Sequence, residues 1–400
     1  MSGRALVIGG SLGGLFAANL LWRAGWDVTV FERTPGHLAG RGAGLVSHPP
    51  LVAALVRAGA VDGAPLGVTV PGRVTFARDG SVLGEHPAPQ VLTSWSRLYS
   101  LLTTALPEGR VRRGWTLAAV RQDARSVTAE FADGTAVTGD LLIGADGVRS
   151  VVRGLFLPGV RTEYAGYIAW RGVVDEGALP VATHRALFER FAFSLPDGEQ
   201  MLGYPIAGED DDTRPGRRRY NFVWYRPADP VALAAMQTDG SGHLHSHGIP
   251  PGLIRPSFVA AMRADADHVL APQFADVVRA CATPFFQPIQ DLTVPQMAWG
   301  RVALLGDAAF VARPHVGMGV TKAAQDAMAL TDAVLAAPGR VPDALAAYAG
   351  VRQPAGAAVV TRARALGAYM QAPRHPAQAP ADASQHRTPS AVMRETAWMV

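Results

Sequence analysis

A glycine-rich segment near the start of the chain, Gly9-Gly10-Ser11-Leu12-Gly13-Gly14, has the residue types and spacing that bind a phosphate chain. It follows a continuous apolar run and opens a helical pattern, which is the context that a dinucleotide fingerprint requires. Gly9 permits the tight turn, and Gly14 lets helix and strand pack closely. The free N–H groups at Ser11 and Leu12 would face a pyrophosphate at the helix N-terminus. Ser11 replaces the usual middle glycine with a small residue that can donate to phosphate.

A carboxylate stands where such a fingerprint needs one. Glu32 ends the next β-type run, 23 residues after Gly9, and there it can accept hydrogen bonds from a ribose diol. Arg33, which follows it, is also expected beside the bound dinucleotide. The alternative is a glycine-rich turn between a strand and a helix that binds nothing.

Two further aspartates follow apolar runs later in the chain. Asp146 lies in Gly144-Ala145-Asp146-Gly147, although an Asp-Gly pair is by itself also a turn signal. Asp307 follows the run 302–305, and at the end of a strand its carboxylate can accept from a ribityl hydroxyl. The backbone around Pro314, Gly317 and Gly319 can then approach the edge of a pyrimidine-like ring, since glycine adds no side chain.

The elements that must position these residues alternate between strand and helix. The pattern predicts strands over 5–8 and 27–32 on either side of a helix over 12–24, which together form a βαβ unit. Helices are predicted over 51–58, 96–106 and 319–335, and strands over 115–120, 126–131, 135–138, 141–143 and 301–306. Residues 160–290 are rich in alternating aromatic positions, which is typical of a mostly antiparallel sheet. The composition of 373–389 predicts a mobile tail.

The length and composition favour a folded protein of two closely packed domains over a nucleic-acid-binding or secreted protein. Of the 400 residues 48% are hydrophobic and 18% charged, and the net charge is only +4. Lys322 is the only lysine, and the arginines are scattered except for the run 217–219, which follows the acidic run 209–212 and predicts a solvated hairpin tip. The single cysteine, Cys281, is consistent with a reducing compartment, so we expect a cytoplasmic protein. Stable membrane association is not expected, because no apolar run other than the glycine-containing 5–22 approaches membrane-spanning length.

The three motifs together resemble the group A flavoprotein monooxygenases, the para-hydroxybenzoate hydroxylase type, over about residues 4–370. The resemblance implies an α/β protein in which an FAD-binding Rossmann-like domain of the glutathione-reductase type, 1–160 and 290–370, is interleaved with a mostly antiparallel β-sheet substrate domain, 161–289. Some sheet segments of 65–100 join the substrate domain, and 371–400 form a partly mobile C-terminal tail. Arg97 and Arg41 match family arginines on the FAD side.

The resemblance also implies the chemistry. FAD is bound non-covalently, NAD(P)H binds transiently and reduces it, and a flavin hydroperoxide formed with O2 hydroxylates an electron-rich aromatic ring. A homodimer is expected. A flavin-binding protein without turnover is the alternative from another class.

Within the family, the likeness is strongest to the branch that hydroxylates dihydroxypyridines. It is carried by Tyr164-Ala165-Gly166-Tyr167, Trp170-Arg171-Gly172, Tyr204-Pro205-Ile206, Phe222-Val223-Trp224-Tyr225 and Gly306-Asp307-Ala308-Ala309-Phe310. The chain departs from that branch at Arg41, Ser47 and His48. The expected substrate is therefore a small hydroxylated, often N-heteroaromatic, ring, and urate or another purine is the alternative.

The resemblance nominates catalytic and substrate-binding residues. His315 follows Pro314, whose carbonyl faces the substrate in the family, so His315 is the first candidate for the base that deprotonates a ring hydroxyl and His48 is the second. Either could instead be a hydrogen-bonded interior histidine. Tyr204 and Arg171 could orient ring oxygens, and Pro314 is expected to line the pocket. Four aromatic residues could line it too, although half of them must point away because side chains alternate along a strand: Tyr167, Phe222, Trp224 and Tyr225.

No metal is expected. His243, His245 and His247 show strand-like spacing but lie in a Gly/Ser/Pro-rich loop, without a carboxylate or thiolate at ligand spacing.

Overall fold

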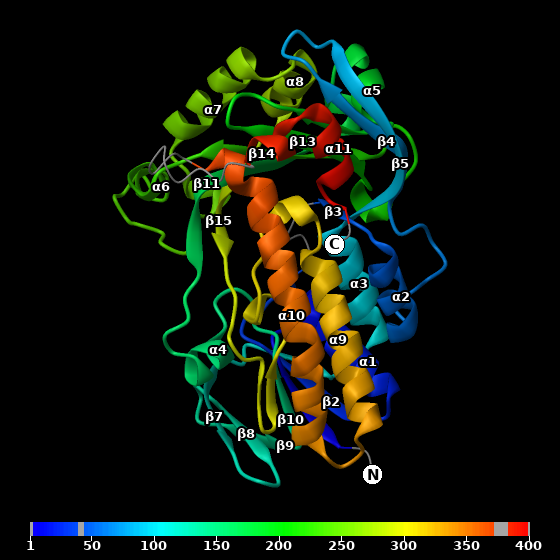
Figure 1. The fold of residues 1–400 in the computed structure, drawn as a ribbon, viewed down its shortest axis with the longest axis vertical. Helices are drawn as coiled ribbons and strands as arrows, with labels where there is room; N and C mark the ends of the chain where they lie inside the picture. Colours follow the sequence, from blue (N-terminus) through cyan, green and yellow to red (C-terminus); the bar gives the residue numbers. More distant parts are fainter. Residues whose placement is uncertain (1–2, 39–43, 372–382, 399–400) are drawn as a thin grey trace.

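The computed structural model describes residues 3–38, 44–371 and 383–398. Arg41, expected to lie beside FAD, is outside the described residues. Two large sheets dominate the fold, the smaller at the bottom of Figure 1 and the larger at the top. The long helix α10 (Val341–Gly367) runs along the smaller sheet towards the larger sheet.

The smaller sheet has the strand order β16-β17-β10-β1-β2-β6. Its strands are β1 (Arg4–Ile8), β2 (Asp27–Glu32), β6 (Val111–Arg113), β10 (Leu141–Gly144), β16 (Ala298–Trp299) and β17 (Val302–Leu304). All neighbours are parallel except β16 and β17. The central strands are uniformly buried, as expected of parallel strands covered on both faces.

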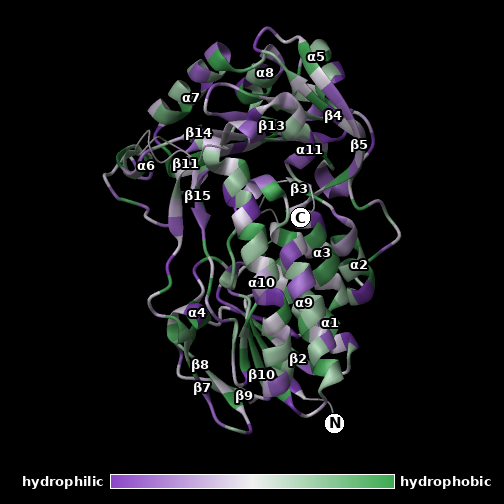
Figure 2. Cartoon of the chain, in the orientation of Figure 1, coloured by the Kyte–Doolittle hydropathy of each residue, from purple (hydrophilic) through white to green (hydrophobic). Residues whose placement is uncertain are grey.

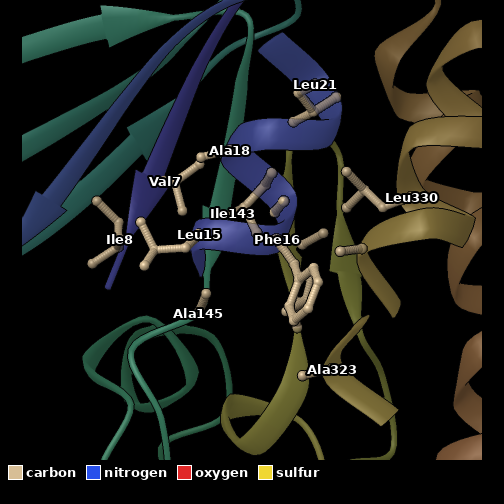
Figure 3. Close-up of a cluster of buried hydrophobic side chains, with 14 of the residues drawn as sticks. Val7, Ile8, Leu15, Phe16, Ala18, Leu21, Ile143, Ala145, Ala323 and Leu330 are labelled. Atoms are coloured by element: carbon tan, nitrogen blue, oxygen red, sulfur yellow. The ribbon is translucent and has the colours of Figure 1, made fainter. Parts of the chain in front are cut away.

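Helices cover one face of this sheet and a small antiparallel sheet covers the other. The helices are α1 (Leu12–Arg23), α2 (Pro49–Ala58), α3 (Trp95–Ala105), α9 (Gly319–Ala336) and α10, and the small sheet is β7 (Leu117–Gln122), β8 (Val127–Phe131) and β9 (Ala136–Gly139). Alternate residues of β1 serve the two layers: Val7 lies beside Gly14 of α1, and Leu6 lies beside Gly139 of β9. Figure 3 shows Leu15, Phe16 and Ala18 packed between Val7 and the α9 residues Ala323 and Leu330.

The larger sheet has the order β15-β11-β14-β13-β12-β4-β5-β3. Its strands are β3 (Gly44–Val46), β4 (Val68–Phe76), β5 (Val82–Ser94), β11 (Glu163–Asp175), β12 (Arg190–Ser194), β13 (Gln200–Ile206), β14 (Arg219–Pro227) and β15 (Phe285–Asp291). Most neighbours are antiparallel, but β12 and β4 are parallel. The sheet thus includes β3, β4 and β5 from the N-terminal part of the chain. Together, the two sheets and their helices confirm the predicted α/β fold class.

The two faces of the larger sheet bury different cores. Helices α5 (Val181–Leu187), α7 (Pro256–Val269) and α8 (Pro272–Ala280) pack on one face, with Trp170, Phe222 and Trp224 beneath them. Tyr204, Val223 and Tyr225 point to the opposite face, towards the smaller sheet. Figure 2, coloured by residue hydropathy, shows polar and apolar residues mixed along α7, α9 and α10.

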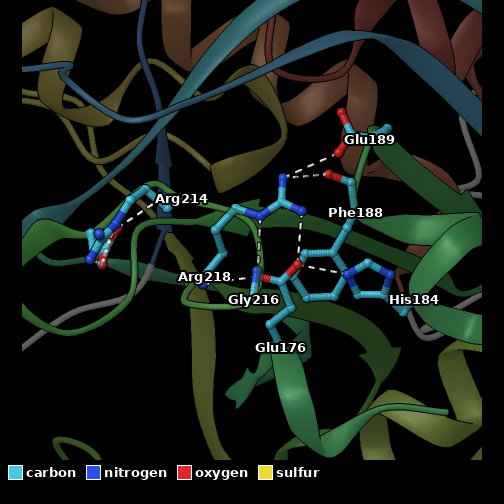
Figure 4. Close-up of polar contacts among 8 residues, drawn as sticks. Glu176, His184, Phe188, Glu189, Arg214, Gly216 and Arg218 are labelled. Carbon is cyan, nitrogen blue, oxygen red and sulfur yellow. Dashed lines mark hydrogen bonds and ion pairs between the residues drawn. The ribbon is translucent and has the colours of Figure 1, made fainter. Parts of the chain in front are cut away.

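The basic run 217–219 is only partly a solvated tip. Arg218 is buried and donates to both carboxylate oxygens of Glu176, which also accepts hydrogen bonds from His184 and from the backbone of Gly216 (Figure 4). Burial alone would raise the pKa of Glu176, but the hydrogen bonds from Arg218 and His184 lower it to about 2. The prediction of a fully solvated hairpin tip is wrong for Arg218.

The end of the chain is not simply a tail. Helix α11 (Pro389–Glu395) packs against β4 and β5, and Thr396 and Ala397 after it are buried. Val392, Met393 and Ala397 thus belong to the core on the larger sheet's inner face. No helix among the described residues is long and apolar enough to span a membrane.

Candidate active site

Two adjoining cavities lie between the sheets. The inner cavity, of about 330 Å³, extends from the start of α1 and α9 to the inner face of the larger sheet. The outer cavity, of about 570 Å³, extends from the start of α1 along β2 towards β7. Ser11, Gly147 and Asp307 line both cavities, so the two form one elongated site.

The glycine segment shapes the point where the two cavities meet. Gly9 has φ +110°, and a Cβ there would overlap the Ala145 carbonyl, whereas a Cβ at Gly14 would overlap the carbonyl oxygen of Gly9. Ser11 and Leu12 line the inner cavity at the N-terminus of α1, whose first turn has no acidic residue. The positive end of this helix is therefore left for an external anion.

Glu32 and Arg33 line the outer cavity at the end of β2. The Glu32 carboxylate accepts from the backbone N–H groups of Gly10 and Thr34, both at 2.8 Å. These bonds hold Glu32 beside the glycine turn, which is where a ribose would have to lie if its phosphates faced α1.

Asp146 also lines the outer cavity, but its carboxylate is engaged by the chain. It accepts from the Ser150 hydroxyl at 2.5 Å and from the Val151 N–H at 2.6 Å, at the start of α4 (Val151–Phe156). Burial raises the pKa of Asp146, and the bond from Ser150 opposes that rise. The visible role of Asp146 is to order the turn behind the cavity.

Asp307 lines both cavities and has one cationic neighbour. Nζ of Lys322 lies 3.8 Å from Oδ1 of Asp307 and is fully buried, without a hydrogen-bond partner among the described residues. Burial raises the pKa of Asp307, and Lys322 opposes that rise. Pro314, Gly317 and Gly319 line the inner cavity beside it, and the first turn of α9 has no acidic residue.

These features fit FAD. Two helix N-termini without acidic residues, a carboxylate beside each, and the buried Lys322 ammonium, which is paired with Asp307 but makes no hydrogen bond among the described residues, supply the donors and acceptors that a dinucleotide with a flavin ring needs. Arg97 is placed differently from the expectation. Its guanidinium pairs with Asp62 at 2.7 Å and Asp211 at 3.5 Å, and it lines neither cavity.

The inner face of the larger sheet supplies a second set of polar groups. Arg171, Tyr204 and Tyr225 all line the inner cavity, among apolar residues that include Leu202 and Val223. Burial raises the pKa of Tyr225 to about 12, and the positive charge of Arg171 opposes that rise. Burial also raises the pKa of Tyr204. Both phenols are therefore neutral at neutral pH, and Arg171 supplies the positive charge beside them.

The structure corrects three of the expected pocket residues. Phe222 and Trp224 point to the opposite face of the sheet, under α7 and α8, because side chains alternate along β14. Tyr167 is on the inner face but is completely covered and does not line the cavity. The fourth aromatic candidate, Tyr225, does line the cavity, together with Val223 and Leu202. Alternation alone would have separated Tyr225 from Trp224 but could not have chosen between the two faces.

The structure also overturns both histidines as direct bases. His315 is buried and lines neither cavity; Nε2 contacts the Tyr167 hydroxyl at 2.8 Å. Burial, and then the charge of Arg313, lower the pKa of His315 to about 3, so it stays neutral at neutral pH. His48 is buried between Thr321 and the Ala397 carbonyl, and burial lowers its pKa as well. Neither ring faces the space where a substrate could bind.

The histidine loop at 243–247 lies away from the site. Nε2 of His245 lies 2.8 Å from Oδ2 of Asp239. Over the part of the chain that the structure describes, no group of three or more His, Cys, Asp or Glu side chains could hold a metal ion.

The fold and the site define an FAD-dependent oxidoreductase, and sequence comparison identifies its family. A family described as an FAD binding domain matches residues 3–174 and 285–363, which is more than half of the chain, and a family described as FAD binding domain-like matches 164–291. The chain belongs to this FAD-binding family. It is a flavin-dependent aromatic monooxygenase whose cofactor is FAD and whose reducing co-substrate is NAD(P)H.

The most similar relatives carry the same assignment. The chain is 34% identical over 334 residues, 82% of each chain, to 2,6-dihydroxypyridine 3-monooxygenase of Paenarthrobacter nicotinovorans. It is 31% identical to 3-amino-4-hydroxybenzoate 2-monooxygenase of Streptomyces cremeus, over 93% of this chain and 89% of the relative.

Solved structures agree with the fold. The 2,6-dihydroxypyridine-3-hydroxylase from Arthrobacter nicotinovorans superposes with a TM-score of 0.86 at 31% identity, covering 95% of this chain and 96% of that one. Klebsiella pneumoniae HpxO, solved with FAD and uric acid, has a TM-score of 0.72 at 24% identity over 90% and 87% of the two chains, a likeness of fold alone.

Proposed function

We propose that this monooxygenase hydroxylates a small ring that binds as an oxyanion, with a hydroxylated pyridine as the first candidate. The observation that carries the proposal is the group Arg171, Tyr204 and Tyr225 on the inner face of the sheet. Nε of Arg171 is buried without a hydrogen-bond partner among the described residues, and Asp307 is the only acidic side chain among the described residues that line the inner cavity. The guanidinium interacts with Tyr225 but forms no ion pair with a carboxylate among the described residues, so a deprotonated ring oxygen would supply its counter-charge.

Binding as an anion also activates the ring. An oxyanion raises the electron density of the ring, and the Arg171 charge lowers the pKa of a bound ring hydroxyl, as any cation within a few ångströms does. With His315 and His48 outside the cavity, the proton leaves to solvent when the substrate binds. Oxygen activation belongs to the reduced flavin. The chain's task is to orient the ring and keep water out, which the apolar residues Leu202, Val223 and Phe191 support.

FAD would lie along both cavities. The pyrophosphate would face Ser11 and Leu12, the ribose Glu32, and the ribityl chain Asp307, with Pro314, Gly317 and Gly319 beside the flavin ring. Arg33 and Asp146 would lie near the adenosine end. Arg97 would contact phosphate only by exchanging one of its two carboxylate partners.

The test is substrate-stimulated NAD(P)H oxidation, with the product identified by mass, over a panel that contains 2,6-dihydroxypyridine, 6-hydroxynicotinate, 3-amino-4-hydroxybenzoate and urate. The first three are substrates named for relatives. We expect turnover of a hydroxypyridine. Turnover of urate alone would select the purine alternative, and stimulation by no ring would favour a flavin-binding protein without turnover.

Variants of Arg171 test the anion directly. Arg171→Lys keeps the charge but loses the paired donors, and Arg171→Met loses both. We expect ring affinity to fall in the order parent, Lys, Met, with Met losing about 10²-fold, the range for removing one partner of a charged hydrogen bond. The released proton should be measurable with a pH indicator on binding to the parent. Equal affinity in all three proteins would contradict the proposal.

Two expectations complete the proposal and rest on sequence alone. The family resemblance favours a homodimer, and the single cysteine, Cys281, favours a reducing, cytoplasmic location. Sedimentation of the holoenzyme and fractionation of cells would test them.

A further inference from the structure

The C-terminal segment 388–398 enters the active site. Thr388 caps α11, which lies on β4 and β5, and the chain then turns so that Thr396 and Ala397 line the inner cavity together with Arg171 and Tyr204. The segment thus contributes Thr396 and Ala397 to the lining of the inner cavity.

A buried arginine holds the segment. Arg73 on β4 is 1% exposed, and its guanidinium donates to the carbonyl oxygens of Met393 at 2.8 Å and Thr396 at 2.6 Å. It also donates to the side chain of Gln90 at 2.7 Å. The last carbonyls of a helix have no partners within the helix, and a cation is favoured at that end.

The arginine depends on the segment in return. Desolvation is the only cause that lowers the pKa of Arg73, to about 10, and no carboxylate among the described residues pairs with it. An unpaired buried charge is costly, so carbonyls at the end of α11 are the groups that make this burial tolerable. Arg73 therefore holds the segment 388–398 in place, and the carbonyls of the segment stabilise the buried charge of Arg73.

The segment is also bound to the wall of the cavity itself. The Ala397 N–H donates to the His315 carbonyl at 2.6 Å, and the Ala397 carbonyl accepts from Gln90 at 3.2 Å and His48 at 3.3 Å. A Cβ on Gly317 would lie 2.8 Å from Cα of Ala397, so glycine is needed for this approach. Both histidines named as catalytic candidates thus contact the C-terminal segment.

We propose that Thr396 and Ala397 are specificity-determining residues of the hydroxylation site, and that Arg73 is the positioning residue that sets them there. The proposal rests on the proposed function for the identity of the ring. Its own content is that the size of the side chain at position 396 decides which rings fit, and that a bound ring covers position 397.

The first test changes the size of the side chain at position 396 in the lining of the cavity. Thr396→Ala should raise kcat/KM for a bicyclic hydroxyquinoline relative to a monocyclic hydroxypyridine, and Thr396→Leu should lower that ratio, each by about fivefold or more, the scale of one or two methylene groups in a pocket. Ser390→Ala, an exposed position on the same helix, is the matched control and should leave the ratio unchanged. An unchanged ratio in both Thr396 variants would overturn the proposal.

The second test needs no turnover. Because the chain's only cysteine, Cys281, is buried, Ala397→Cys introduces a single reactive thiol. In the FAD-loaded protein, a saturating hydroxypyridine should slow its reaction with methyl methanethiosulfonate by about tenfold or more, and should not protect Ser390→Cys. Adding Arg73→Lys should speed the reaction of Ala397→Cys, since lysine cannot hold two carbonyls and Gln90 at once; Arg394→Lys, exposed on the same helix, is its control.

The outcomes separate the two proposals. If a ring protects the thiol of Ala397→Cys but no ring is hydroxylated, the proposed function is rejected and the proposed role of Thr396 and Ala397 stands. If the parent hydroxylates a ring but the thiol of Ala397→Cys is not protected, the proposed role of Thr396 and Ala397 is rejected and the proposed function stands.

Discussion

The hydroxyl of Tyr167 lies 2.8 Å from Nε2 of His315, and both side chains are closed off from the cavity. Helix α10 passes them at Gly367, where a Cβ would lie 3.0 Å from Nε2 of His315. Tyr225 does line the cavity, and the centroid of its ring lies 4.3 Å from the centroid of the His315 ring. His315 therefore supports the wall of the site from behind.

The first prediction is that His315→Gln keeps hydroxylation close to that of the parent. Glutamine retains a hydrogen bond to Tyr167, and a histidine whose pKa is about 3 holds no proton at neutral pH. We expect kcat/KM to change by less than about fivefold, against the ~10²–10⁴-fold loss that removal of a general base causes. The measurement is kcat/KM for the hydroxylated product, together with the ratio of that product to NAD(P)H consumed. A hundredfold loss with full FAD content would restore His315 as base or relay.

The second prediction concerns stability in acid. The pKa of His315 falls from 6.5 in the unfolded chain to about 3 in the folded one, first through burial and then through Arg313. Between these values only the unfolded chain binds the proton, so the free energy of unfolding falls as the pH drops below 6.5. His315→Gln should remove about 1.4 kcal/mol per pH unit of that slope.

Urea unfolding from pH 4.5 to 7.5 would measure this slope. His37→Gln, at an exposed position, is the matched control and should keep the slope of the parent. Parallel curves for the parent and His315→Gln would mean that His315 is not buried as a neutral ring.

The sequence predicted the dinucleotide half of the fold because its determinants are local. The predicted strand 27–32 is β2, and the predicted helix over 12–24 is α1 within one residue, because the glycine turn and Gly25 limit both elements. The carboxylates at the strand ends follow from the same elements. Arg97 shows the limit: its place at the start of α3 is local, but its partner Asp62 comes from another loop.

The substrate side could not be predicted, since it depends on register between distant strands. Val223 pairs with both Leu202 and Arg171, and that register puts Val223 and Tyr225 on the cavity face and Trp224 on the other. The C-terminal segment is a similar case. The sequence predicts a partly mobile tail over 371–400, of which 372–382 lie outside the described residues, but Arg73, more than 300 positions before Met393, holds the segment 388–398 in the site.

The third prediction tests the glycine turn. Gly14→Ala places a Cβ against the carbonyl oxygen of Gly9, and neither backbone can yield without separating α1 from β1. We expect a loss of stability of about 1–3 kcal/mol, as for overpacking, together with loss of bound FAD. Gly36→Ala is the control, because nothing lies within 4 Å of the added atom. Full FAD occupancy in Gly14→Ala, measured from the flavin absorbance of the purified protein, would contradict the close approach.

The fourth prediction concerns Lys322 and Asp307, whose charged atoms lie 3.8 Å apart at the start of α9. Lys322→Met keeps the volume but removes the cation that opposes the rise in the pKa of Asp307, so the carboxylate should take up a proton at higher pH than in the parent. Asp307→Asn removes the negative charge itself. Each change should weaken FAD by about 1–3 kcal/mol, the cost of losing a hydrogen-bonding or charged partner at a buried group. FAD affinity of the apoprotein, followed by quenching of flavin fluorescence from pH 5 to 9, gives the loss of affinity and the pH at which Asp307 takes up its proton.

In the variant that carries both changes, Lys322→Met and Asp307→Asn, the two losses of affinity should not add, since residues in contact share one interaction. Strict additivity would show that Lys322 acts on the cofactor independently of Asp307, and loss of turnover at unchanged FAD affinity would give Asp307 a chemical role instead of a binding one.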